Sequence, residues 1–243
     1  MKKYIYKLET HAHTIHNSHC AETPPQKVAQ VYARKGYNGI VCTNHFNTHD
    51  NIYLKNQYGA SDDADIMELY LRDFHDLKKE GARVGLDVFC GAEISPDCTT
   101  YYKQKPPYRE FLLIGVPPEL MLAEGLLLLK MDEKQLFEWC ISHDVLLVQA
   151  HPFREICTPA DPRYLHGVEV ANLHPLHNSK NRKALRFCRE HNLIGTGGSD
   201  FHFPLGIGGG IYLPRAPKDE ADLVALIKSR DFKIIRSRFH LDK

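Results

Sequence analysis

Short apolar runs alternate with amphipathic stretches along most of this 243-residue chain. Apolar positions in the amphipathic stretches recur every three or four residues, which is typical of helices with one buried face, whereas the short runs are typical of buried strands. The pattern predicts strands at residues 4–10, 39–43, 86–93, 111–115, 145–150, 167–171 and 193–196. It predicts helices at residues 24–35, 62–80, 132–142, 179–191 and 219–228.

The alternation of strands and helices indicates how these elements assemble. Strands separated by helices usually form a parallel sheet, and chains of this length commonly form one βα barrel. We therefore expect a single α/β domain over residues 1–243, with a closed or nearly closed barrel. Gly81 is expected to end the second helix, residues 46–61 to form a loop and residues 206–210 to form a turn.

Composition and charge exclude several classes of protein. The formal net charge is only +1, so no global field attracts nucleic acid, and the longest apolar run, near residues 126–129, is far shorter than a membrane span. The N-terminus lacks the apolar segment of a signal peptide, so we expect a cytoplasmic protein. Seven scattered cysteines without a Cys-x-x-Cys pair indicate neither a disulfide framework nor a thiolate zinc ribbon. The oligomeric state is not indicated.

Residues able to bind metal follow most of the predicted strands. His11 and His13 are two apart on an extended stretch, so their side chains point to the same side. In a barrel the carboxyl ends of the strands form one face, and imidazoles and carboxylates gathered there make a metal site. The side chains expected to meet at this face are His11, His13, His45, Glu93, His151, Asp200 and His202.

Five motifs together resemble the signature of the PHP (polymerase and histidinol phosphatase) family. They are His11-x-His13, Thr43-Asn44-His45, Gly91-x-Glu93, Ala150-His151-Pro152 and Gly198-Ser199-Asp200-Phe201-His202. The resemblance implies a distorted seven-stranded TIM-like βα barrel that holds two or three divalent metal ions, such as zinc, manganese or iron. It further implies hydrolysis of phosphoester bonds by water that the ions activate, with a small phosphorylated molecule as substrate.

The resemblance also implies a distribution of ligands among the ions. One ion would take His11, His13, Glu93 and Asp200, a second would share Glu93 and use His151, and a third would use His19, His45 and His202. The catalytic residues implied are Glu93, Asp200 and His202.

Two departures from the family pattern bear on the centre. Asn44 stands where family members usually have an aspartate that can orient a ligand imidazole, although its amide could still accept a hydrogen bond from an imidazole. Residues 115–117 contain no histidine where trinuclear members have one after the fourth strand, and Pro117 cannot bind metal. The second ion therefore has few protein ligands, and a centre of two ions is the alternative to three.

Several residues could bind the substrate. Arg154, three residues after His151, could clamp a phosphate, and Asn172 ends a predicted strand. Two loops could cover the site or simply be surface loops. The first carries Tyr101, Tyr102, Lys103, Lys105, Tyr108 and Arg109, and the second carries Tyr53 and Lys55.

Two other functions fit the same residues. An amidohydrolase-like enzyme that cleaves carbon–nitrogen bonds also carries a His-x-His motif after its first strand. A non-catalytic PHP module, stabilised by metal and associated with a polymerase, is the second alternative.

Overall fold

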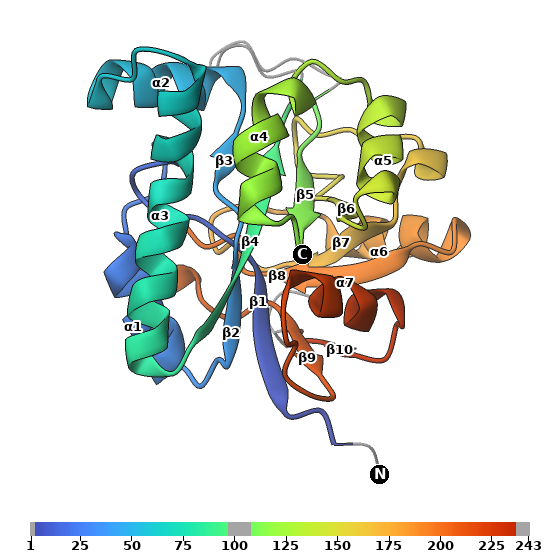
Figure 1. Ribbon diagram of the computed structural model, residues 1–243. Coiled ribbons are helices and arrows are strands. Elements are labelled where there is room, and N and C mark those ends of the chain that lie inside the picture. Colours follow the sequence, from blue (N-terminus) through green and yellow to red (C-terminus); the bar gives the residue numbers. More distant parts are fainter. Residues whose placement is uncertain (1–2, 97–107, 237–243) are drawn as a thin grey trace.

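The computed structural model describes residues 3–96 and 108–236, which form a mixed α/β fold around a nearly closed, barrel-like sheet (Figure 1). The hydrogen-bonded order is β10-β9-β1-β2-β4-β5-β6-β7-β8, and β3 pairs with β4. The strands are β1 (Tyr6–Ala12), β2 (Gly39–Cys42), β3 (His45–Phe46), β4 (Asp87–Ile94), β5 (Phe111–Ile114), β6 (Leu146–Gln149), β7 (Gly167–Asn172), β8 (Ile194–Gly198), β9 (Ile211–Leu213) and β10 (Lys233–Ile234).

The sheet closes where the chain after β8 meets β1. Ala12 and Phe201 form a parallel bridge, and the His13 amide donates to the Phe201 carbonyl at 2.9 Å. Strands β9 and β10 extend the sheet beyond β1 in antiparallel fashion. The predicted α/β barrel class is thus confirmed, but the count of seven is not, since the described residues contain ten strands.

The sheet is mixed rather than wholly parallel, which corrects the expectation. Strand β5 runs antiparallel to both of its neighbours, β4 and β6. Parallel neighbours need a crossover connection of a dozen or more residues, usually a helix, and within the described residues no helix lies between β4 and β5. The reversal places the start of β5, rather than its end, beside the carboxyl ends of the other strands.

Seven α-helices surround the sheet in the described part of the chain. They are α1 (Pro25–Arg34), α2 (Thr48–Tyr58), α3 (Asp63–Val84), α4 (Pro118–Leu128), α5 (Glu133–Ser142), α6 (Asn181–Glu190) and α7 (Glu220–Lys228). Asp62, Asp132 and Asp219 cap three of them by accepting from a backbone amide three residues later. Short 3-10 turns occupy η2 (Pro162–Tyr164) and η3 (Pro204–Gly206).

Three helical segments differ from the prediction. The expected loop at 46–61 contains α2, which has only one buried apolar residue, Leu54, so an apolar period could not indicate it. Helix α4 was not predicted because apolar residues cover nearly all of its sides. Helix α3 continues past Gly81 and ends at the left-handed Gly85. Gly81 is required for packing instead, because a Cβ there would lie 2.5 Å from the Leu86 carbonyl oxygen.

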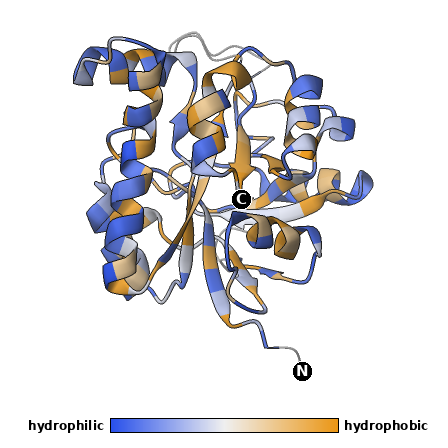
Figure 2. Cartoon of the chain, viewed as in Figure 1, coloured by the Kyte–Doolittle hydropathy of each residue, from blue (hydrophilic) through white to orange (hydrophobic). Residues whose placement is uncertain are grey.

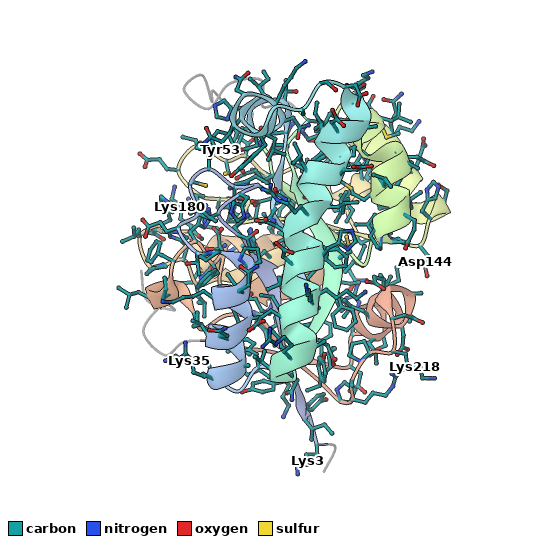
Figure 3. The ribbon with its side chains drawn as sticks, turned by 60° about the vertical axis from the view of Figure 1, so that its left-hand side comes forward. Lys3, Lys35, Tyr53, Asp144, Lys180 and Lys218 are labelled. Atoms are coloured by element: carbon teal, nitrogen blue, oxygen red, sulfur yellow. The ribbon has the colours of Figure 1, made fainter. Side chains whose placement is uncertain are left out.

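Apolar side chains of the strands and inner helix faces form the core. Figure 2 shows hydrophobic residues along β5 and α4 and hydrophilic ones on the outer side of α3. Exposed charged residues such as Lys35, Asp144 and Lys218 project from the outside of the ribbon (Figure 3). Within residues 3–96 and 108–236, none of the helices combines the length and the apolarity that crossing a membrane requires.

Candidate metal centre

Glu93, at the end of β4, lies at the middle of a buried cluster of imidazoles. Its Oε1 is 3.2 Å from Nε2 of His11 and 3.2 Å from Nε2 of His151. Its Oε2 is 2.9 Å from Nδ1 of His45 and 3.4 Å from Nε2 of His13. One carboxylate thus faces four imidazoles that come from three different parts of the chain, an arrangement suited to a ligand shared between ions.

Asp200, which follows β8, faces two of the same imidazoles. Its Oδ1 lies 3.4 Å from His11 Nε2 and 3.3 Å from His13 Nε2. His202 adds a ring whose centroid is 4.4 Å from that of His13. The seven side chains predicted to meet are therefore brought together, and their role as metal ligands stays a prediction.

The backbone at two strand ends turns these side chains inward. His151 has a φ of 24° and Asp200 a φ of 52°, both in the left-handed region that non-glycine residues rarely adopt. Such conformations persist only where the surroundings enforce them, and they concentrate at functional sites.

Buried carboxylates behind the cluster orient it. Oε1 of Glu169 lies 3.1 Å from His11 Nδ1, and its Oε2 accepts from the His151 amide and the Asn172 side chain. Glu9 accepts from the His11 amide at 3.0 Å and from the Ser199 amide at 2.9 Å, which ties β1 to the segment before Asp200. Such outer partners fix the tautomer and orientation of ligand imidazoles. The prediction missed Glu169, although a carboxylate inside an otherwise apolar strand is a recognisable signal.

Unpaired buried atoms in the cluster indicate, independently of any motif, that it is suited to hold divalent ions. Nε2 of His11, Nε2 of His13 and both carboxylate oxygens of Glu93 are buried, yet within the described residues none of them has a hydrogen-bond partner. Buried polar atoms left unpaired are costly, and a shared cation satisfies such atoms. Nitrogen and oxygen donors of this kind suit zinc, iron or manganese.

The charges in the cluster depend strongly on one another. Burial disfavours the ionised form of Glu93, but the charges of His11 and His45 outweigh it and hold its pKa well below the usual value. Burial and the Arg154 charge oppose protonation of His151, but contacts with Cys157 and Glu93 prevail and raise its pKa to about 10. Burial likewise opposes protonation of His11, yet Glu93 and Asp200 raise its pKa well above the usual value.

Metal binding is therefore expected to release protons. Without metal, His151 stays protonated until the pH approaches its pKa of about 10, and an imidazole must lose that proton to bind an ion. At pH 7 we expect release of at least about one proton for each protein molecule that loads, and affinity that rises with pH from 6 towards 10. Titration calorimetry in two buffers of different ionisation enthalpy measures the release, and heats that are the same in both buffers would contradict the prediction.

Glu110, which the prediction did not include, lies beside His151, where the second ion was expected to have few protein ligands. Because β5 runs antiparallel, its beginning lies at the centre, and Glu110 Oε2 is 3.4 Å from His151 Nε2. Pro117 follows the opposite end of β5, so residues 115–117 lie at the end of that strand that points away from the centre. Donor atoms of Glu110, His151 and Cys157 all lie within 4.8 Å of one another.

His19 and Asn44 have partners that the sequence did not indicate. Nδ1 of His19 lies 2.6 Å from Oδ1 of Asp50 on α2, and the two form a candidate donor group with His49. Asn44 accepts from the Thr14 amide at 2.7 Å and donates to the Thr14 hydroxyl. Its expected hydrogen bond with an imidazole is therefore not formed, and it fastens the loop after β1 instead.

Arg154 and Asn172 contact each other and the centre. The Arg154 guanidinium donates to Asn172 Oδ1 at 3.1 Å and to Asp200 Oδ2, and Asn172 donates to Glu169 at 2.9 Å. Burial opposes ionisation of Asp200, whereas Arg154 and then His11 hold its pKa well below the usual value. Arg154 is the residue of this pair that lines the cleft above the centre.

The cleft above the cluster has a volume of about 460 Å³. His174 and His177, with ring centroids 4.4 Å apart, form part of its wall, and burial lowers the pKa of His174 to about 3. Tyr108 also lines it, whereas Arg109 forms an ion pair with Glu133 of α5 at 2.8 Å. Tyr101, Tyr102, Lys103 and Lys105, predicted to cover the site, lie outside the described residues. Tyr53 and Lys55 lie on α2 and not in a loop.

Comparison with known proteins agrees with this fold and with one of the motifs. Residues 178–232 match the family model of the PHP-associated region, which includes Asp200 and His202. No curated protein matches the chain in sequence. The match therefore covers the C-terminal part of the chain and one of the five motifs, Gly198-Ser199-Asp200-Phe201-His202.

Two solved structures are similar in fold, and a third gives a weaker match. A two-domain protein from Bacteroides vulgatus that contains a predicted PHP-like metal-dependent phosphoesterase has 17% identity and a TM-score of 0.66, covering 95% of this chain and 64% of that one. An amidohydrolase from Chromobacterium violaceum has 15% identity and a TM-score of 0.53 over 81% of this chain and 87% of that one. A candidate metal-dependent phosphoesterase from Bifidobacterium adolescentis has 14% identity and a TM-score of 0.48 over 82% and 88%.

The resemblance to the PHP family predicted from the motifs is confirmed by the family-model match and the shared fold. The chain spans less than two thirds of the length of the Bacteroides protein.

Proposed function

We propose that the protein is a metal-dependent hydrolase that cleaves phosphoester bonds of a small molecule, as a phosphatase or a phosphodiesterase. The observation that carries the proposal is the convergence of four imidazoles on Glu93, in a buried cluster of which His45 also lines the cleft. Two or three divalent ions held there would supply an activated water and would stabilise negative charge on the attacking and leaving oxygens. Phosphoester hydrolysis needs both effects.

The ligand sets implied by the resemblance are retained in this proposal. His11, His13, Glu93 and Asp200 would hold one ion, and Glu93 and His151, now with Glu110, would hold a second. His45 and His202 would hold a third, with His19 as their further ligand by resemblance to the family. Glu93, Asp200 and His202 are the residues proposed to act in catalysis through the ions.

The surroundings of the cluster suit a small phosphorylated substrate. A volume of about 460 Å³ is in the range of pockets for small ligands. Arg154 presents a guanidinium to the cleft, and that group recognises phosphate oxygens through paired hydrogen bonds. Asn172 holds Arg154 at 3.1 Å, so it would position the clamp rather than bind substrate itself.

Hydrolysis of a carbon–nitrogen bond is the second candidate, favoured by the likeness in fold to an amidohydrolase whose structure holds bound sulfate and no metal. Amidohydrolases often bridge their ions with a carboxylated lysine. Among the described residues that line the cleft there is no lysine, and Glu93 takes the central place. The phosphoester reaction is therefore preferred.

A panel of phosphomonoesters, phosphodiesters, amides and lactams tests the proposal on protein loaded with zinc, manganese or iron. We expect turnover of phosphoesters that a chelator abolishes and added metal restores. Turnover confined to amides or lactams would favour the second candidate. Metal that raises the melting temperature without turnover of any substrate would favour a non-catalytic module associated with a polymerase.

A further inference from the structure

We propose that Cys20 is a metal ligand of the proposed centre, where its thiolate joins His13, His45 and His202 around one ion. In this arrangement His13 serves that ion rather than the first one, and Cys20 takes the place that the resemblance gives to His19. The inference rests on the metal centre of the proposed function and specifies the chemistry of one of its positions. A sulfur donor in this group was indicated neither by the spacing of the cysteines nor by the motifs.

The position of Cys20 in the cleft is the first observation. Its side chain lines the cleft together with His45 and His202. The backbone holds it there, because the amide of Glu22 donates to the His202 carbonyl at 2.9 Å and the amide of Ala21 donates to the Ser18 carbonyl at 2.8 Å. The thiol therefore reaches the cluster without a rearrangement of the chain.

The three imidazoles beside Cys20 provide the second observation. Ligand nitrogens of His13, His45 and His202 lie within 4.8 Å of one another, as ligands of one ion must. Nε2 of His13 is fully buried and, within the described residues, has no hydrogen-bond partner, although it lies 3.3 Å from Asp200 Oδ1 and 3.4 Å from Glu93 Oε2. An ion between these atoms and the Cys20 sulfur would satisfy that nitrogen.

The neighbouring residue His19 is engaged elsewhere. Its Nδ1 lies 2.6 Å from Asp50, and its candidate donor group contains His49 and Asp50. The turn after β1 thus places His19 beside Asp50, and Cys20 in the wall of the cleft that His45 and His202 also line.

A thiolate ligand would change which metal the centre selects. On binding, the Cys20 thiol loses its proton to solvent and the sulfur lone pair coordinates the cation. Three imidazoles with one thiolate favour zinc, cobalt or ferrous iron over manganese or magnesium, which prefer oxygen donors. The position that contains Cys20 would then prefer a different metal from the positions made only of imidazoles and carboxylates.

Cobalt substitution of the full chain tests the assignment by absorption spectroscopy. Metal is removed by chelation, and cobalt(II) is added in successive equivalents. We expect an intense near-ultraviolet sulfur-to-cobalt charge-transfer band, its loss in Cys20→Ser and Cys20→Ala, and at least about tenfold weaker binding of one ion in these variants. Circular dichroism verifies that the variants are folded.

Three controls identify the sulfur. Cys188→Ser, whose thiol donates to the Leu193 carbonyl at 3.3 Å, and His19→Ala are expected to keep the band. A band that disappears in Cys157→Ser and persists in Cys20→Ser would overturn the assignment, since Cys157 lies 3.6 Å from His151. Absence of the band from the cobalt-loaded wild type would overturn it as well.

The same samples separate this inference from the proposed function. Phosphoester turnover without a sulfur band would reject Cys20 as a ligand and leave the enzyme intact. A sulfur band without turnover on the substrate panel would support Cys20 and reject the phosphoesterase.

Discussion

Replacing Glu93 with glutamine is expected to abolish phosphoester hydrolysis, with a fall of at least about 10³-fold in kcat/KM. The amide keeps the shape of the side chain but loses the charge, and its NH₂ group cannot bind a cation. Because each oxygen of Glu93 faces two imidazoles, more than one ion should be lost. Elemental analysis of the purified variant measures this loss directly, alongside steady-state kinetics.

The matched control is Glu68→Gln, on the exposed side of α3, which should keep both metal content and turnover. Circular dichroism distinguishes loss of metal from loss of fold. If folded Glu93→Gln retained full metal content and wild-type turnover, Glu93 would not belong to the centre.

Replacing Gly209 with alanine is expected to destabilise the protein by about 3 kcal/mol or more, one of the largest effects of a single methyl group in this chain. A Cβ at Gly209 would lie 2.1 Å from the Gly198 carbonyl carbon and 2.2 Å from the Ser199 nitrogen. The main chain on both sides cannot move freely, because the amide of Gly209 donates to the Ser199 hydroxyl at 2.7 Å. Since Ser199 precedes Asp200, activity should fall as well. Urea or thermal unfolding measures the stability.

Gly208→Ala is the control for that substitution. A Cβ at Gly208 meets nothing within 4 Å, so its effect should remain within about 0.5 kcal/mol. Equal destabilisation by the two substitutions would show that the whole turn, and not the close approach of Gly209 to β8, determines stability.

The residues at the centre of the candidate site could be predicted from the sequence because their signal is local. His11 and His13 share one side of a strand by spacing alone, and the other donors follow short apolar runs that form buried strands. The same local signals predicted five of the described helices, with aspartate caps at Asp62, Asp132 and Asp219 that fit the boundaries. These features depend on neighbouring residues, which the sequence specifies directly.

What only the tertiary structure decided depends on contacts between distant segments. Glu110 lies at the centre only because β5 reverses direction, and the direction of a strand is determined by its partners, not by its own residues. The pairing of His19 with Asp50 depends on α2, which has almost no apolar period because it buries little apolar surface. Glu169 orients His11 from 158 positions away in the chain. The sequence thus determined which donors are available, whereas packing decided which of them meet.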